Sequence, residues 1–387
     1  MQGGAMISEG GYGCIFSPYI TCSGKVTKNY NYISKIQVKG FSAENEIKIG
    51  KKISKIPFFY RYFVPAIYHC DINIKEFKNT DIDQCRIIKE HRRSPYILLK
   101  MPFIGYKYSI ISYKDYIIQD LNDREILLNL IDGYQHLLGA LQLLETHRIC
   151  HFDLNGDNIL FSQEKTIPLI VDFGLSISID QFNDQWSEFF YVYAPQYYFW
   201  PLEVHYINFL ENKGKPTSDD LKKMCSTYVK HNVPLQQNFS PAFLKKYEAL
   251  CLDVVKSYLE KSLTKDDLLQ YWYTWDNYTL SIMYLRIIFF LNITKTGSAY
   301  VHNSFIINFS QILLQNIHPN PTKRLRLKKT AEIFASFFYN PEVNKVENYD
   351  ILLKNFSLNK KQLHKEVFED IAQFKKLIKR WSKTKNN

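Results

Sequence analysis

The sequence predicts an α+β protein with two lobes, a small β-rich lobe followed by a larger and mostly helical one. Strand-like runs separated by tight turns dominate the first 40 residues. From residue 124 onward, apolar residues recur mainly at helical spacing. With 387 residues, the chain is long enough for two lobes that each bury a core.

The small lobe is expected at 1–102. It begins with ISEGGYGCIF, a polar loop and the strand-like run YISKIQV at 32–38. Residues 42–56 predict one main helix, because isoleucines recur there among charges and Pro57 follows its end. The unbroken apolar run that opens YILLKMPF, at 96–103, predicts a buried strand. The segment MPFIGYK that overlaps it is the expected hinge between the lobes.

The large lobe is expected at 103–340. Residues 124–147 carry apolar side chains at helical spacing over their whole length. The most apolar stretch, 278–293, is shorter than the ~20 residues that a bilayer span needs, and Arg286 interrupts it. We therefore expect a buried core helix there, and no membrane span.

Composition narrows the class of protein only slightly. The chain is 46% apolar and 22% charged, as in ordinary folded soluble proteins. Lys and Arg outnumber Asp and Glu by 49 to 38, and the surplus of +11 favours acidic partners such as phosphate groups, nucleic acid or anionic membrane. A solvated basic surface explains the surplus equally well.

The cysteines predict a reducing compartment. Their number is odd, they are scattered and no C-x-x-C occurs, which argues against a disulfide framework or a zinc site. The N-terminus has no charged-then-apolar signal segment, so a cytoplasmic location is expected. The seven cysteines are Cys14, Cys22, Cys70, Cys85, Cys150, Cys225 and Cys251.

A glycine-rich stretch, ISEGGYGCI at 7–15, is a candidate phosphate-binding turn. Ser8, Gly10 and Gly13 have the spacing of G-x-G-x-x-G, with serine in the first place. Glycine lets backbone N–H groups approach phosphate oxygens without a side chain in the way. A strand-like run follows instead of a helix, which excludes a dinucleotide-binding fingerprint. Taken alone, glycines between strands are more often plain turns.

Two later motifs carry stronger chemistry. HFDLNGDN at 151–158 places Asp153 five residues before Asn158, and VDFG at 171–174 adds Asp172. Phosphoryl transfer from ATP needs Mg²⁺, which prefers hard oxygen ligands, and Asn158 and Asp172 supply them. It also needs a carboxylate that accepts the proton of the attacking hydroxyl, and Asp153 is the candidate base.

Together these motifs resemble the eukaryotic-type protein kinase family over residues 7–335. The resemblance implies a bilobal protein-kinase-like fold with a small antiparallel sheet, and ATP and Mg²⁺ as cofactors. It implies that Lys35 in YISKI positions the ATP phosphates and that Glu46 orients Lys35. Lys25, Lys28 and Glu44 lie near enough to leave this pair open.

The resemblance also implies which residues contact the nucleotide. Residues 96–101 are expected to line the adenine pocket, with Leu99 near the gatekeeper position and 100–102 as the connection between the lobes. The nucleotide-contacting residues implied are Ser8, Gly10, Gly11, Tyr12, Gly13, Ile15, Lys35, Glu46, Leu99 and Met101.

Three further segments resemble structural marks of the family. Pro201-Leu202-Glu203 stands where A-P-E ends the activation segment, Asp276 is expected to bond the catalytic-loop backbone, and Arg324 is expected to pair with Glu203. Small-molecule kinases share the catalytic loop but lack these marks. The marks therefore favour a protein substrate.

Two departures from the family pattern bear on activity. Phe152 replaces an arginine that binds a phosphorylated activation segment in many members, so we expect activity that does not depend on such phosphorylation. Asn155 replaces a lysine that contacts the transferring phosphate in serine/threonine kinases, so a reduced rate is expected. The Ser and Thr residues between Asp172 and Glu203 are Ser176, Ser178 and Ser187.

Two segments go beyond the family pattern. Residues 208–268, helical in pattern, look like an insertion that serves as a docking surface or as extra packing. A basic extension follows at 341–387, and 358–387 predict an amphipathic helix. Its end, 375–387, has six basic residues and no acid, so it either contacts nucleic acid or an anionic surface, or packs on its own domain.

The prediction is an active serine/threonine protein kinase that transfers the γ-phosphate of ATP to protein hydroxyl groups. The amino-acid composition and the glycine-rich stretch ISEGGYGC resemble those of kinases encoded by large cytoplasmic DNA viruses. This resemblance implies that the protein is located in the host cytoplasm or in the virus particle. Two alternatives stay open. One is a pseudokinase scaffold that binds ATP and partners without turnover, and the other is a small-molecule kinase.

Overall fold

The computed structural model divides into two compact units. Unit 1 comprises Met1–Tyr113 and Asp157–Ser178, and unit 2 comprises Lys114–Gly156 and Ile179–Asn387. Each unit is described by itself. The described residues are 4–11, 13–77, 81–105, 110–117, 122–162, 167–292, 304–339, 353–354, 356–363, 365–366, 369 and 376.

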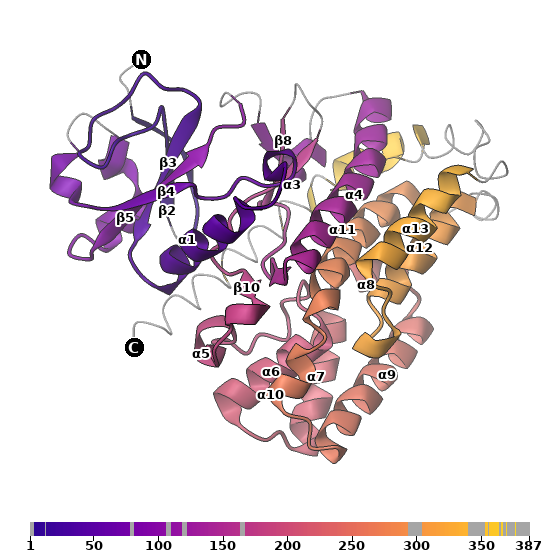
Figure 1. Ribbon diagram of the computed structural model, residues 1–387. Helices are drawn as coiled ribbons and strands as arrows, with labels where there is room; N and C mark the ends of the chain where they lie inside the picture. Colours follow the sequence, from indigo (N-terminus) through magenta and orange to yellow (C-terminus); the bar gives the residue numbers. More distant parts are fainter. Residues whose placement is uncertain are drawn as a thin grey trace. The chain divides into compact units, whose positions relative to one another are not determined.

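Unit 1 is built around a five-stranded antiparallel sheet (Figure 1). Its strand order is β1-β2-β3-β5-β4, so the third and fifth strands of the chain pair at the centre. These strands are β1 Ala5–Glu9, β2 Gly13–Ser17, β3 Tyr32–Val38, β4 Tyr68–Ile72 and β5 Tyr96–Pro102.

The pleat of β5 divides the apolar core of unit 1 in two. Successive side chains of a strand point to opposite faces of the sheet. Leu98 accordingly packs in one cluster with Ile36, whereas Leu99 and Met101 pack in another with Ala43 of α1 (Phe41–Ile53). The buried strand expected at 96–103 is therefore present, but only alternate residues face α1.

A second, three-stranded antiparallel sheet also belongs to unit 1, with the order β6-β8-β9. An isolated bridge joins Phe63 to Ile170 of β9. These pairings group 157–178 with unit 1, although the sequence placed those residues in the large lobe. The remaining elements of unit 1 are η1 Phe59–Arg61, η2 Ile74–Glu76, η3 Asp81–Gln84, α2 Arg86–Glu90, β6 Ile110–Ser112, β8 Ile159–Ser162, β9 Pro168–Ile170 and β10 Ile177–Ser178.

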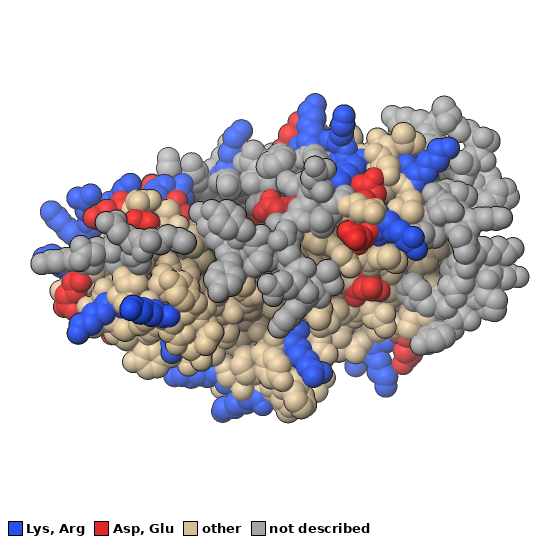
Figure 2. Space-filling view, turned by 90° about the horizontal axis from the view of Figure 1, so that it is seen from above, with Lys and Arg blue, Asp and Glu red and all other residues tan. Residues whose placement is uncertain are grey.

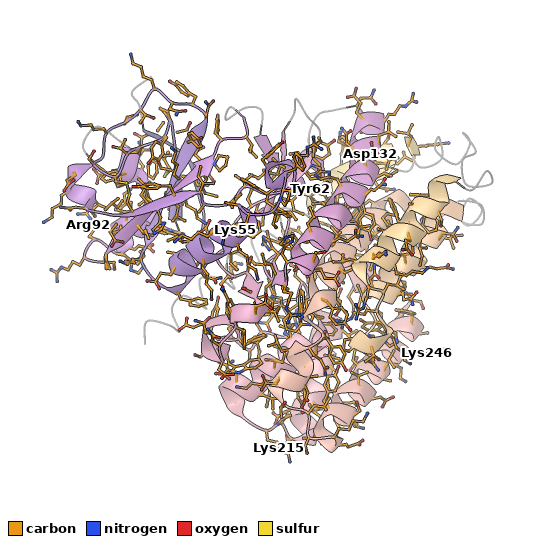
Figure 3. All side chains as sticks on the ribbon, viewed as in Figure 1. Lys55, Tyr62, Arg92, Asp132, Lys215 and Lys246 are labelled. Atoms are coloured by element: carbon orange, nitrogen blue, oxygen red, sulfur yellow. A yellow bond between two sulfur atoms is a disulfide. The ribbon has the colours of Figure 1, made fainter. Side chains whose placement is uncertain are left out.

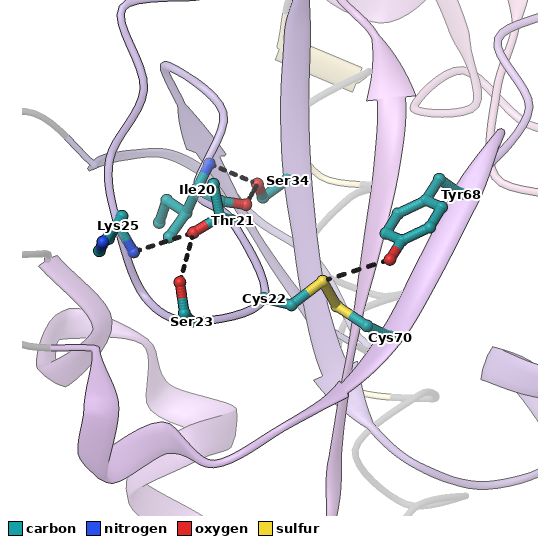
Figure 4. The surroundings of a disulfide bond; sticks show 8 residues. All are labelled: Ile20, Thr21, Cys22, Ser23, Lys25, Ser34, Tyr68 and Cys70. Atoms are coloured by element: carbon teal, nitrogen blue, oxygen red, sulfur yellow. Dashed lines mark hydrogen bonds between the residues drawn. A yellow bond between two sulfur atoms is a disulfide. The ribbon is translucent and has the colours of Figure 1, made fainter.

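Two disulfides cross-link unit 1, and the expectation of no disulfide framework is therefore wrong. Cys14 on β2 is bonded to Cys85, and Cys22 is bonded to Cys70 on β4 (Figure 4). The partners are 71 and 48 residues apart, so the tertiary fold brings them together and their spacing along the chain carries no signal. The inference of a reducing compartment loses its basis with this finding.

Unit 2 is mostly helical. The apolar stretch predicted as a core helix forms α11, whose residues 275–288 are all buried, and α11 packs against α8 and α12. No described helix is long and apolar enough to cross a membrane. The elements are α3 Tyr113–Ile117, which starts at the last residue of unit 1, α4 Asp123–Thr146, β7 Ile149–Cys150, η4 Ile179–Gln181, α5 Trp186–Phe189, α6 Leu202–Lys213, α7 Ser218–Lys230, α8 Val233–Asn238, α9 Pro241–Glu260, α10 Lys265–Leu269, η5 Trp272–Thr274, α11 Trp275–Asn292, α12 Ser304–Asn316, η6 Pro321–Lys323 and α13 Leu327–Tyr339.

The segment read as an insertion, 208–268, is helical as expected. It begins inside α6 and contains α7 to α10. Capping boxes at Thr217 and Thr264 start α7 and α10. α7 packs against α9, and the Tyr247 hydroxyl on α9 donates a hydrogen bond to the Ile317 carbonyl at 2.7 Å. These helices are thus part of the packing of unit 2.

The described part of the C-terminal extension belongs to unit 2 and packs against the rest of it. Phe356 and Leu363 are buried, and the Asn359 side-chain amide donates to the Phe290 carbonyl at 3.0 Å. Lys360 pairs with Asp123 at 3.2 Å. The predicted helix at 358–387 falls largely outside the described residues, as does its basic end apart from residue 376.

On the face shown in Figure 2, the Lys and Arg side chains of the described residues do not form one continuous patch. Lys and Arg side chains occur there in several separate groups among the described residues, some of them next to Asp or Glu. The surplus of +11 alone therefore does not identify a binding face.

Candidate active site

Three charged side chains meet in unit 1. The Lys35 ammonium lies 2.8 Å from Glu46 Oε2 and 3.0 Å from Asp172 Oδ1. The side chains of Lys35 and Glu46 are only 7% and 1% exposed, whereas that of Asp172 is 35% exposed. The Lys35–Glu46 pair expected from the sequence is present. Of the alternatives left open, Lys25, Lys28 and Glu44 are exposed.

The local structure explains why Lys35 and Glu46 meet. Lys35 lies opposite Leu99 in the β3–β5 register, on the sheet face that packs against α1. Glu46 belongs to the buried face of α1. Gln37, two residues after Lys35 and hence on the same face, donates from Nε2 to Glu46 Oε2 at 3.1 Å. Strand alternation was the signal that could have identified Gln37.

The pKa directions follow from burial and charge. Burial alone would lower the pKa of Lys35, but the carboxylates of Asp172 and Glu46 more than offset it, so the pKa is raised. Burial raises the pKa of Glu46, against the effects of the Lys35 ammonium and the Gln37 amide. Lys35 is therefore a fixed positive charge at neutral pH.

The structure shows the conformation or surroundings of each residue of the Asp172-Phe173-Gly174 motif. Asp172 has φ of 62°, a left-handed conformation that is unusual outside glycine and is found at functional sites. Phe173 is fully buried and packs edge-on against Phe63, with ring centroids 6.1 Å apart. A Cβ at Gly174 would lie 2.5 Å from Ser42 Oγ, so a larger residue there would require the Ser42 hydroxyl to move.

Asn158 is tied to the same part of unit 1 through its backbone. Its carbonyl accepts a hydrogen bond from the N–H of Val171, the residue before Asp172, at 3.0 Å. Asn158 is buried, and Asp172 is partly exposed. An amide oxygen and a carboxylate are the kind of donors that Mg²⁺ takes from proteins, because the ion usually keeps several of its waters. The donor chemistry of the two residues thus fits Mg²⁺.

The glycine-rich stretch forms the turn between β1 and β2. The Gly10 N–H donates to the Gly13 carbonyl at 2.9 Å, and Ser8 lies opposite Ile15 in the register. A Cβ at Gly13 would lie 2.5 Å from the Ile36 carbonyl oxygen, so this glycine permits the close approach of β2 to β3. Gly11 lies in the turn, and Tyr12 lies outside the described residues.

The expected adenine-pocket residues are divided between the faces of the sheet. Leu99 and Met101 are buried on the face that carries Lys35. Lys100 points the other way, with its ammonium 4.0 Å from the centroid of the Tyr32 ring and 4.9 Å from that of Tyr19. Leu99 and Met101 are therefore the candidates to form a pocket wall, and Lys100 is not.

Asp153 belongs to unit 2, in the loop after β7. Asp276 of α11 holds this loop, since its carboxylate accepts the backbone N–H groups of His151 at 2.7 Å and Phe152 at 3.0 Å. The expected contact between Asp276 and the loop is thus present. Phe152 has φ of 66°, so this loop also contains a left-handed residue.

Two donors surround the Asp153 carboxylate. The Tyr197 hydroxyl donates to Asp153 Oδ1 at 3.3 Å, and Asn155 Nδ2 lies 3.4 Å from the same oxygen and 3.0 Å from the Asp153 carbonyl. Burial, followed by the charge of Asp153, raises the pKa of Tyr197 well above its usual value. Tyr197 therefore stays a neutral donor. Sequence reasoning missed it, because nothing in the spacing of YYFWPLE distinguishes it from its neighbours.

An aromatic cluster surrounds Phe152, where the family pattern has a cation. Its ring stacks on Trp200 with centroids 5.2 Å apart, and it also contacts Phe190 at 5.4 Å and Trp275 at 5.6 Å. The Trp200 indole N–H donates to the Phe152 carbonyl at 3.0 Å. These contacts make the surroundings of Phe152 apolar.

The expected pair between Arg324 and Glu203 is confirmed within unit 2. Two nitrogens of the guanidinium bond the two carboxylate oxygens at 2.5 and 2.8 Å, and the Trp275 indole donates to Glu203 at 3.0 Å. Both charged side chains are fully enclosed.

The structure thus brings together Lys35, Glu46 and Asp172 in unit 1, with Asn158 joined through the backbone. Asp153 is described with unit 2, among Tyr197, Asn155 and Asp276. Comparison of the chain with protein-family models gave no matching family, and comparison with curated proteins gave no matching relative. The function is therefore inferred from these geometries and their chemistry.

Proposed function

We propose that this protein is a serine/threonine protein kinase that transfers the γ-phosphate of ATP to protein hydroxyl groups with Mg²⁺. The observation that carries the proposal is the buried Lys35 ammonium, which Glu46 anchors and which also contacts the partly exposed Asp172. A cation held in this way is suited to bind phosphate oxygens, because it is already oriented and charged.

The roles of the residues follow from their chemistry. Lys35 positions phosphate oxygens, and Glu46 with Gln37 holds Lys35 in place. Asn158 and Asp172 would hold Mg²⁺, which neutralises phosphate charge when it is bound. Asp153 accepts the proton of the acceptor hydroxyl.

The surroundings of Asp153 suit such a base. Tyr197 donates a hydrogen bond to one carboxylate oxygen, which favours the ionised form. The Asp276 contacts fix the backbone before Asp153. Asn155 contributes an amide where the family pattern has a cation, so we propose a slower phosphate transfer than in members that retain the lysine.

The fold supports the same proposal at a coarser level. A five-stranded antiparallel sheet with a long helix in unit 1, and a helical unit 2, are compatible with a bilobal protein-kinase-like fold. The Arg324–Glu203 pair and the Asp276 contacts favour a protein kinase over a small-molecule kinase, because the resemblance assigns them to protein kinases. The same resemblance carries the proposal that the protein is of viral origin.

The test is phosphate transfer from labelled ATP and Mg²⁺ by the full chain, to itself and to basic generic protein substrates. Asp153→Asn is expected to lower transfer by about 10²–10⁴-fold, since it removes the base. Asp157→Asn, four residues further on and exposed, is the matched control and is expected to leave transfer near the wild-type rate. Binding of a fluorescent ATP analogue and the melting temperature verify that each variant is folded.

Other outcomes would contradict the proposal in distinct ways. A folded wild type that binds ATP without transferring phosphate would favour the pseudokinase scaffold. Transfer to metabolites but to no protein would favour a small-molecule kinase. Undiminished transfer by Asp153→Asn would remove Asp153 from the role of base, and phosphoamino-acid analysis of the product would identify the acceptor hydroxyl.

A further inference from the structure

The turn that follows α1 in unit 1 exposes two large aromatic rings. The side chains of Phe58 and Tyr60 are 61% and 60% exposed, within the stretch KIPFFYRY at 55–62. Figure 3 labels Lys55 and Tyr62, the two ends of this stretch. Single exposed apolar residues are ordinary on a protein surface, whereas neighbouring ones mark contact sites more often.

The backbone holds these rings outward at some cost. Phe58 has φ of 58° and ψ of 25°, a left-handed conformation that is unfavourable for a residue with a Cβ. The turn is nevertheless well anchored, because the buried Ile56 and Phe63 flank it. Within it, the Arg61 N–H donates to the Phe58 carbonyl at 3.0 Å, and the Phe63 N–H donates to the Phe59 carbonyl at 2.8 Å. Strain that the surroundings maintain is typical of functional sites.

The same region is strongly basic. Residues 48–61 contain five cations and no Asp or Glu. The nearest acid before them on α1 is Glu46, which is buried and paired with Lys35. Burial and the neighbouring Lys52 charge lower the pKa of Lys48, as expected where positive charges are close together. The cations are Lys48, Lys51, Lys52, Lys55 and Arg61.

We propose that this aromatic–basic turn, residues 55–62 together with Lys51, docks on the surface of an anionic lipid bilayer. Phe and Tyr rings partition into the interfacial layer of a membrane, and Lys and Arg attract anionic head groups. Charge complementarity selects anionic over neutral lipid. This inference goes beyond the proposed phosphate transfer and does not depend on it.

The ring geometry favours lipid over nucleic acid as the partner. Bases bind to aromatic side chains by stacking on the ring face. The Arg61 guanidinium already lies over the Phe58 ring, 5.3 Å from its centroid. Tyr60 meets the rings of Phe58 and Phe59 edge-on, at 73° and 76° between planes. Lipid chains and head groups need no free parallel face.

The test is co-sedimentation of the full chain with vesicles of phosphatidylcholine, alone or mixed with phosphatidylserine, at several salt concentrations. We expect binding to the mixed vesicles that weakens as salt rises. Phe58→Ser/Tyr60→Ser should weaken this binding at least about tenfold, because both rings leave the interface. Lys55→Gln and Arg61→Gln should each weaken it about fivefold, as about 1 kcal/mol per cation implies.

Two further variants keep the test decisive. Phe58→Gly should fold at least as well as the wild type, because glycine adopts a positive φ readily, and it should still bind vesicles more weakly. Tyr30→Ser removes another exposed aromatic ring, 52% exposed and outside the turn, and should bind like the wild type. Melting temperatures establish that all variants are folded.

Three results would overturn the proposal. The first is equal vesicle binding by the wild type and by Phe58→Ser/Tyr60→Ser. The second is binding that only Lys379→Gln/Arg380→Gln/Lys383→Gln, in the basic C-terminal stretch, abolishes. The third is retention of a labelled oligonucleotide through the turn with no binding to any vesicle, which would assign the turn to nucleic acid.

Discussion

The two units each bury an ion pair, and the pairs differ in how completely they are enclosed. In unit 2, Arg324 and Glu203 form two hydrogen bonds with each other, and the remaining Arg324 nitrogen donates to the His318 carbonyl at 2.8 Å. In unit 1, Lys35 shares its charge between the buried Glu46 and the partly exposed Asp172. The closed pair can only hold the fold together, whereas the open one can also serve a ligand.

Both pairs keep their charges for the same reason. Burial opposes the charged form of Arg324 and of Lys35, but the adjacent carboxylates more than offset it, so both pKa values are raised. The two ion pairs therefore differ in their solvent exposure and in their hydrogen bonding, and not in their protonation states. Removing one cation from each pair should separate a structural role from a functional one.

The largest expected effect is on the closed pair. Arg324→Met should lower the free energy of unfolding by about 3–5 kcal/mol, because it leaves the Glu203 carboxylate buried without its partner. Urea unfolding followed by tryptophan fluorescence measures this. Lys329→Met breaks an exposed pair with Glu332 on α13 and is the matched control, with little change expected. A loss from Arg324→Met no greater than the control's would show that the closed pair does not stabilise unit 2.

The open pair should respond in activity more than in stability. Lys35→Met is expected to lower phosphate transfer by about 10²–10³-fold, as when a transition-state donor is lost. Its effect on unfolding should be smaller than that of Arg324→Met, because Glu46 keeps the Gln37 hydrogen bond and burial already favours its protonation. Lys39→Met, which breaks the exposed pair with Asp71, is the control in the same unit. Equal activities of the two variants would contradict the assigned role of Lys35.

The disulfides extend the comparison, because all four bonded cysteines belong to unit 1 and the three free ones, all buried, belong to unit 2. Replacing either bonded pair by serines should lower the free energy of unfolding by about 2–4 kcal/mol, slightly more for Cys14–Cys85, which closes the longer loop.

A thiol reductant should open Cys22–Cys70 first, because Cys14 and Cys85 are fully buried whereas Cys22 and Cys70 are not. Alkylation followed by mass spectrometry gives the order, and simultaneous opening would contradict it.

These features were not equally accessible from the sequence. Lys35, Glu46 and Asp172 could be predicted because local motifs carry them, and so could the helices at 41–53 and 275–292, whose apolar patterns are strong. Disulfide pairing could not be predicted, because it depends on which loops and strands, 71 and 48 residues apart along the chain, the tertiary fold brings together.

The contact of Tyr197 with Asp153 could not be predicted from the sequence either. It depends on the path of an irregular segment, which no periodicity describes. The side of the sheet to which each residue of 96–102 points could have been predicted from alternation, once the pleat was considered.

A smaller effect is expected from His205, in the enclosed interior of unit 2. Its ring lies 5.5 Å from that of Tyr228 and 6.2 Å from that of Trp200, and burial lowers its pKa from 6.5 to about 3. The folded protein keeps His205 neutral, whereas the unfolded chain binds a proton below pH 6.5. Stability should therefore fall as pH drops from 6.5 toward 3, with a slope of up to about 1.4 kcal/mol per pH unit.

Unfolding measured between pH 7 and 5 tests this, because most carboxylates remain ionised there. His205→Phe should flatten the slope, since a neutral ring replaces the titrating one. His231→Phe, at an exposed position, should leave the slope as in the wild type. A slope that His205→Phe does not change would assign the pH dependence to other groups.

The smallest expected effect concerns the segment before Glu203. Phe152 packs among Trp200, Phe190 and Trp275, and it stands where the kinase pattern that the sequence resembles has an arginine, so residue 152 offers no cation to a phosphate on this segment. Ser176 and Ser178 are buried, and the Ser178 hydroxyl already accepts a hydrogen bond from Lys52 at 3.1 Å. Ser176→Ala/Ser178→Ala/Ser187→Ala should therefore retain phosphate transfer within about twofold of the wild type, as should Ser187→Glu at the exposed position. A folded triple variant that has lost phosphate transfer would contradict this expectation. If Ser187→Glu, combined with Ser176→Ala/Ser178→Ala, then restored the transfer, phosphorylation would be shown to order this segment. The aromatic cluster around Phe152 would then not be sufficient to order this segment. The contrast between the closed, structural pair of unit 2 and the open, functional pair of unit 1 would then not extend to this segment.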